Sequence, residues 1–173
     1  MKATELLELL RQFRKDKLTM LRRHVASARY VSDYDFNNTY QYVIAREEMH
    51  VSWLTDAVLN VAADMAKTDA NGLLDQVDEP PISVEGKGEA AQQSVIAQDR
   101  DDAGRFVEQW RPRVQAIKHA RHRTMLNVVL GETLEHKRFF EQALAGRTDL
   151  LGRRADGAGT GGGVLPILSL IHI

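Results

Sequence analysis

The chain has 173 residues, which is the size of one ordinary domain with room for a tail. Its 23 Lys and Arg nearly balance 24 Asp and Glu, and the net charge of −1 predicts no general attraction to nucleic acid or to membranes. Cysteine is absent, which excludes disulfides, iron–sulfur clusters and thiolate metal sites. No apolar run is long enough to span a bilayer, and the first residues do not resemble a signal peptide. We therefore expect a cytoplasmic protein.

Proline and glycine divide the chain into a helical body and a tail. No proline precedes Pro80, so the chain before it is free to be helical. Seven of the twelve glycines lie after residue 145, and the run 155–163 has the composition of a flexible linker. We predict one domain over 1–150 and a disordered tail over 151–173.

The end of that tail is an unusual sequence. LSLIHI (168–173) is the in-frame translation of CTGTCTCTTATACACATC, a transposase adapter used in sequencing libraries. We hypothesise that this segment is adapter, with a genuine apolar tail as the alternative. The codons at these positions decide between the two.

Two long helices are predicted before the first proline. Over 3–31 the apolar residues recur at the three- and four-residue spacing of one helix face, namely Leu6, Leu10, Phe13, Met20 and Leu21. The second helix covers 36–67, after SDYD (32–35), whose side chains can cap a helix N-terminus. TDANG (68–72) marks its end.

A crossover of about 20 residues follows, because DEPPISVEGKG (78–88) cannot be continuous helix. A third helix begins near Glu89, and a fourth ends at Gly146. Pro112 leaves their boundary open: it can lie in the first turn of the fourth helix, or it can kink a longer third helix that turns near Lys118. We favour the second alternative, which gives four helices of similar length.

This order of links predicts an all-α protein, a ferritin-like four-helix bundle. Its two antiparallel hairpins would be joined by one long crossover between the second and third helices. A generic four-helix bundle is the alternative, because helix periodicity alone specifies neither handedness nor ligands.

Charged residues stand where the core of the second helix is expected. Glu47 and His50 are three residues apart, so they share one helix face, and that face also carries Val43 and Leu54. A carboxylate and an imidazole in a bundle core cost several kcal/mol unless they are compensated, and a divalent metal ion is one compensation. In the fourth helix, His136 lies on the face that also carries Leu126, Val129 and Phe140. Glu132 lies one turn before it.

These two segments, REEMHVSWL (46–54) and LGETLEHKRFFEQAL (130–144), resemble the half-sites of the rubrerythrin-like branch of the ferritin-like superfamily, and the resemblance covers about 3–146. It implies a di-iron or, alternatively, di-manganese site that oxidises ferrous iron or reduces peroxide. The implied ligands are Glu47, His50, Glu132, His136 and Asp99. The implied partners are metal ions, dioxygen or peroxide, an external electron donor and further copies of the chain.

The chain also departs from the pattern of that family. Thr133 stands where the second motif has Glu, and the first helix offers Lys17 and His24 where a carboxylate is expected. A bundle that has lost its metal and acts as an oligomeric binding or structural module is therefore the alternative function. If Lys17 fills the metal position, the residues form an ion-pair network instead.

One segment has a strongly biased charge. RPRVQAIKHARHR (111–123) carries five Lys and Arg, two His and no acidic residue. A solvated face or a subunit contact is the interpretation we favour over a phosphate contact.

Overall fold

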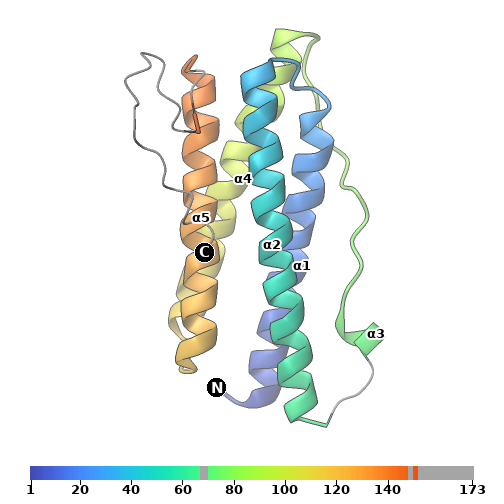
Figure 1. Ribbon diagram of the computed structural model, residues 1–173, viewed down its shortest axis with the longest axis vertical. Helices are drawn as coiled ribbons and strands as arrows, with labels where there is room; N and C mark the ends of the chain where they lie inside the picture. Colours follow the sequence, from blue (N-terminus) through green and yellow to red (C-terminus); the bar gives the residue numbers. More distant parts are fainter. Residues whose placement is uncertain (67–69, 148–149, 152–173) are drawn as a thin grey trace.

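The computed structural model describes residues 1–66, 70–147 and 150–151. Within them the chain is helical and contains no strand; the helices are α1 (Ala3–Ala28), α2 (Tyr34–Asp64), α3 (Ala70–Leu73), α4 (Glu89–Gln115) and α5 (Ala120–Leu144). The four long helices run side by side (Figure 1). The prediction of an all-α four-helix bundle is therefore confirmed.

The helices begin and end close to the predicted signals. Asp33 caps α2, where its Oδ1 accepts a hydrogen bond of 3.1 Å from the backbone N–H of Phe36. Pro112 lies inside α4, near its C-terminal end, and the chain turns between Gln115 and Ala120. This confirms the longer third helix. The missing N–H of proline removes one hydrogen bond, close to a helix end.

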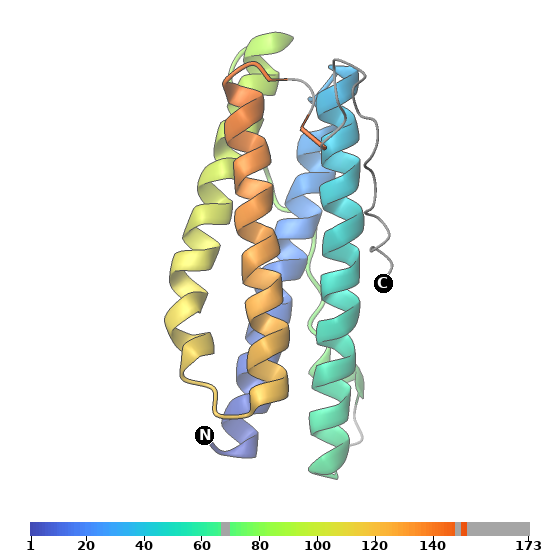
Figure 2. The ribbon, with the colours of Figure 1, turned by 60° about the vertical axis from the view of Figure 1, so that its left-hand side comes forward.

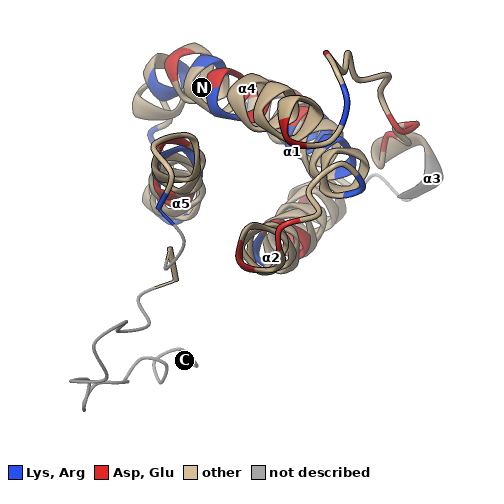
Figure 3. Ribbon diagram, turned by 90° about the horizontal axis from the view of Figure 1, so that it is seen from above, with Lys and Arg blue, Asp and Glu red and all other residues tan. Residues whose placement is uncertain are grey.

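The long helices associate chiefly in two pairs. α1 packs along α2, and α4 packs along α5, while α1–α4 and α2–α5 contacts are sparser. Seen along the bundle (Figure 3), α3 lies outside α1, on the side away from α5. The buried apolar side chains form two clusters, one around Trp110 and one around Phe140. On α2 and α5 the buried positions between these clusters are polar, namely Glu47 and His50 on α2 and Thr133 and His136 on α5.

The crossover from α3 to α4 runs in a largely extended form along the outside of the bundle (Figure 1 and Figure 2). Side chains of two helices hold it there: the Arg14 guanidinium donates to the backbone oxygen of Asp75 at 3.0 Å, and the Gln98 amide donates to that of Ser83 at 2.5 Å. Gly86 adopts φ +78° next to α4, where a Cβ would approach the Cβ of Ala90 to 2.8 Å. The predicted interruption of helix at the crossover is confirmed.

The described helices include none that is both long and apolar enough to cross a membrane. Most of the predicted tail (151–173), including the adapter hypothesis for 168–173, lies outside the described residues. Leu150 is buried in the cluster around Phe140.

Candidate functional site

A layer of polar side chains crosses the middle of the bundle, between the two apolar clusters. Every long helix contributes to it, and each member is at most 2% exposed: Lys17, His24, Glu47, His50, Asp99, Thr133 and His136. The burial predicted for Glu47, His50 and His136 is confirmed. Polar groups in such surroundings cost several kcal/mol unless they are paired, so their contacts decide what the layer can do.

Lys17 lies at the centre of this layer. Its Nζ is 2.9 Å from Glu47 Oε2 and donates to Thr133 Oγ1 at 2.9 Å. The second carboxylate oxygen of Glu47 pairs with Nδ1 of His24. Burial acts to raise the pKa of Glu47, but the charges of His24 and Lys17 outweigh it and hold that pKa well below its ordinary value. Glu47 is therefore an ionised carboxylate between two cationic partners.

The surroundings of His24 favour its charged form. Burial acts to lower the pKa of His24, but the carboxylates of Glu47 and Asp99 outweigh burial and raise it. Asp99 itself accepts hydrogen bonds from the Tyr40 hydroxyl at 2.5 Å and from Nε of Arg23 at 2.9 Å. Burial, together with the charge of Asp99, raises the pKa of Tyr40 well above its ordinary value, so its hydroxyl stays protonated and donates.

Glu132 lies on the α2 side of the layer and is held by two residues of α2. Arg46 donates to it through Nε and a terminal nitrogen, both at 2.8 Å, in a bidentate pair. His50 Nε2 lies 3.2 Å from the same carboxylate. Burial acts to raise the pKa of Glu132, but its contacts with His50 and Arg46 outweigh burial and lower it to about 2.

Three imidazoles of the layer carry a ring nitrogen without a hydrogen-bond partner: Nε2 of His24, Nδ1 of His50 and Nδ1 of His136. The rings of His50 and His136 are stacked with their centroids 6.3 Å apart. Burial lowers the pKa of His50, and it lowers that of His136 to about 3, so both rings are neutral near pH 7. Neutral imidazole nitrogens without partners are potential ligands.

The five predicted metal ligands do not form one cluster. His50 contacts Glu132, and its ring is next to that of His136. Glu47 instead contacts Lys17. Asp99 contacts Tyr40 and Arg23. Among the residues that the structure describes, no three His, Asp or Glu side chains are placed to hold a metal ion. The metal-ligand assignments of these five residues remain predictions.

The donor set as arranged does not fit a two-metal carboxylate centre. Such a centre needs carboxylates with free oxygens facing one another. Here an ammonium group is bound to Glu47, and a guanidinium to Glu132. Sequence reasoning named Lys17 as the cation that could fill this space. It did not predict that Arg46 and Tyr40 pair with these carboxylates, because a single sequence does not show which residues lie opposite each other across two helices.

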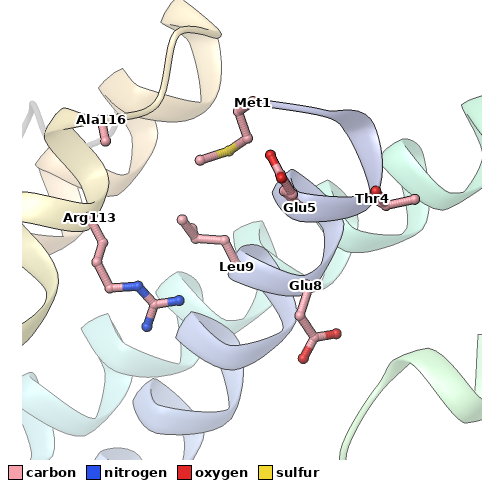
Figure 4. Close-up of a pocket in the computed structure, with 7 residues that line it drawn as sticks. All are labelled: Met1, Thr4, Glu5, Glu8, Leu9, Arg113 and Ala116. Carbon is pink, nitrogen blue, oxygen red and sulfur yellow. The ribbon is translucent and has the colours of Figure 1, made fainter.

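A surface pocket of about 510 Å³ lies away from the layer, at the N-terminal end of α1, where Glu8 and Leu9 of α1 and Arg113 of α4 line it (Figure 4). The Arg113 guanidinium stacks on Trp110, 4.1 Å from the ring centroid, and donates to Gln12 at 3.0 Å. The pocket shares no residue with the polar layer.

The hydroxyl of Tyr40 gives a direct test of the layer. Tyr40→Phe is expected to lower the free energy of unfolding by about 1–3 kcal/mol, because the buried Asp99 carboxylate loses a donor. Tyr34→Phe is the matched control, since Tyr34 is 76% exposed, and it should change stability by less than about 0.5 kcal/mol. Urea unfolding followed by circular dichroism measures both; equal effects would contradict the assignment.

Comparison of the chain with protein-family models, with curated proteins and with solved structures finds no match in any of the three.

Proposed function

We propose that this chain is a ferritin-like bundle of two hairpins, α1–α2 and α4–α5, in which a buried lysine takes the place of a metal ion. In this role the protein is a non-catalytic binding or structural module. The supporting observation is the position of Lys17, whose Nζ lies 2.9 Å from both Glu47 Oε2 and Thr133 Oγ1.

The ammonium group of Lys17 does part of what a metal ion would do. It neutralises the Glu47 carboxylate in the core, and its contact with Thr133 joins α1 to α5. Two further contacts also link α1 or α2 to the α4–α5 pair, those of Arg46 with Glu132 and of Arg23 with Asp99. A tethered ammonium cannot dissociate, change its oxidation state or act as a Lewis acid toward a substrate oxygen, so we assign the layer the role of tying the helices together.

A second candidate function, binding of iron or manganese, is favoured by the ring nitrogens without partners on His50 and His136. Imidazole nitrogens and carboxylates are ligand types that iron and manganese bind, and these nitrogens with the nearby Glu132 provide both. Glu132 would first have to exchange its bidentate partner Arg46 for the metal.

Metal analysis separates the two candidates. The full chain is incubated with Fe²⁺ without oxygen, or with Mn²⁺, desalted, and measured for metal per chain by mass spectrometry. We expect the wild type to retain no more metal than the Glu47→Ala/His50→Ala double variant, because Lys17 already compensates Glu47. Glu47→Gln, which keeps the size of the side chain, provides the comparison if the double variant loses its helical circular dichroism signal.

The opposite result would overturn the first candidate. Metal near one or two ions per wild-type chain, lost in the variants, would show that these residues are ligands and that Lys17 moves away from Glu47 when metal binds.

A further inference from the structure

A second surface pocket, of about 340 Å³, lies between α1 and α4 and is bounded by the crossover at Pro80. Its residues on each helix are spaced by three and four positions, so one stripe of α1 and one stripe of α4 face it. Its apolar side chains are Met20, Phe106 and Pro80. The volume lies in the range of about 300–1,000 Å³ that is usual for small-molecule sites. We call it the Asp16 pocket, after the acidic residue of α1 that lines it.

Three of the four charged side chains that line the Asp16 pocket already have partners. Nε of Arg23 lies 2.6 Å from one carboxylate oxygen of Asp102, and Arg105 pairs with the other. The same Nε lies 2.9 Å from Asp99 of the polar layer, and a terminal nitrogen of Arg23 donates to Gln98 at 2.7 Å. Two guanidinium groups are thus balanced by two carboxylates. An anionic ligand would have to displace a carboxylate from them, so the pocket does not suit an anion.

The fourth charged side chain, Asp16, has no counterion. Its Oδ2 accepts a hydrogen bond of 2.9 Å from the indole Nε1 of Trp110, which is a neutral donor. Among the described residues, no cationic group lies within ion-pair distance of this carboxylate. The guanidinium of Arg113 stacks on the same indole, 4.1 Å from its centroid, but donates to Gln12. The pocket therefore contains one partly buried carboxylate that is free to pair with a cation.

The nearby ammonium of Lys17 does not neutralise Asp16. Its Nζ lies 3.5 Å from the sulfur of Met20 and 5.3 Å from the centroid of the Phe106 ring, two residues that also line the pocket. That ammonium is paired with Glu47 in the polar layer. Met20 and Phe106 thus have the polar layer on one side and the pocket on the other, where they provide apolar contact surface.

We propose that the Asp16 pocket binds a small organic cation, a primary ammonium with a short apolar chain. The ammonium pairs with Asp16, which keeps its hydrogen bond from Trp110, and the apolar chain packs on Met20, Phe106 and Pro80. The charged contact orients one end of the ligand, and each methylene that leaves water adds to the affinity. This inference goes beyond the proposed function, because it assigns a ligand to a pocket outside the polar layer, whichever cation that layer holds.

A titration with hexylammonium tests the charge of the ligand. Hexan-1-ol and hexanoate are the matched controls, since they carry a neutral or an anionic group on a chain of the same length. The full chain is labelled with ¹⁵N, and the indole N–H resonance of Trp110, which donates to Asp16, reports binding; Trp53→Phe assigns the two indole resonances. We expect hexylammonium to shift this resonance to saturation and the two controls to bind at least about tenfold more weakly.

Variants test the residue that carries the charge. Asp16→Asn keeps the size of the side chain and an oxygen that can accept from Trp110, but it removes the charge. We expect it to weaken hexylammonium binding at least about tenfold. Asp56→Asn, at an exposed position of α2, is the matched control and should leave the affinity unchanged. Circular dichroism checks that each variant is folded.

The apolar contact has its own probe. Methylammonium should bind at least about tenfold more weakly than hexylammonium, because it leaves the apolar lining uncovered. Equal affinity for the two amines would overturn the apolar part of the proposal. No saturable shift with hexylammonium, equal affinity for hexan-1-ol, or equal affinity of wild type and Asp16→Asn would each overturn the ammonium site. Metal retention is measured without amine and with other variants, so the two proposals fail independently.

Discussion

Replacing Lys17 with methionine is expected to lower the free energy of unfolding by about 3–5 kcal/mol, the range for removing one partner of a buried ion pair. Methionine preserves the length of the side chain but leaves Glu47 Oε2 without its cation and Thr133 without its donor. Chemical unfolding followed by circular dichroism measures the change. Lys15→Met, on the exposed side of the same helix, should stay within about 0.5 kcal/mol of wild type.

A double variant separates lost pairing from lost packing. Lys17→Met with Glu47→Gln removes the buried carboxylate as well as the ammonium, and the amide can still bond to His24. We expect it to recover part of the loss, because an unpaired neutral amide costs less than an unpaired charge. If the free energy of unfolding of Lys17→Met lies within about 1 kcal/mol of the wild-type value, the Lys17–Glu47 pair does not stabilise the layer.

Between pH 7 and pH 5, His136 is expected to remove about 2 kcal/mol of stability. Burial lowers its folded pKa to about 3, against 6.5 for the unfolded chain. Below pH 6.5 the unfolded state therefore binds a proton that the folded state does not, so stability falls as the pH falls, by up to about 1.4 kcal/mol per pH unit.

His136→Leu should remove this part of the pH dependence. The other histidines are present in both proteins, so the difference between the two stability profiles isolates His136. The carboxylates with lowered pKa, Glu47 and Glu132, lose their contribution only as the pH falls below about 4.5, the ordinary value. His24 has a raised pKa, so its contribution is fully present below 6.5 and is lost only at higher pH. Parallel profiles for wild type and His136→Leu would contradict the prediction.

Much of the fold could be predicted from local patterns. Apolar spacing located the four long helices, the Asp33 cap preceded α2, and the prolines and glycines of 78–88 marked the crossover. Pro112 was harder, because proline suits both the start of a helix and the last turn of a slightly longer one. The short helix α3 carries too few residues to show a period.

The site was predictable only in part. The apolar neighbours of Glu47 and His50 revealed their burial, since burial follows from periodicity within one helix. Partners follow from the packing between helices, which one sequence does not encode locally. For this reason the pairing of Glu132 with Arg46, which turns a predicted ligand into half of an ion pair, became visible only in the folded bundle.

The polar layer also has a consequence for the order of assembly. Lys17 and Glu47 belong to neighbouring helices of one pair, but Thr133 belongs to the other pair, as do Glu132 and Asp99, the partners of Arg46 and Arg23. Until the two pairs dock, these charges can remain hydrated. Docking is therefore the step at which water leaves them, and a wrong register between the pairs would strand a charge without its partner. A misaligned bundle therefore costs the free energy of unpaired buried charges in addition to the lost apolar contacts.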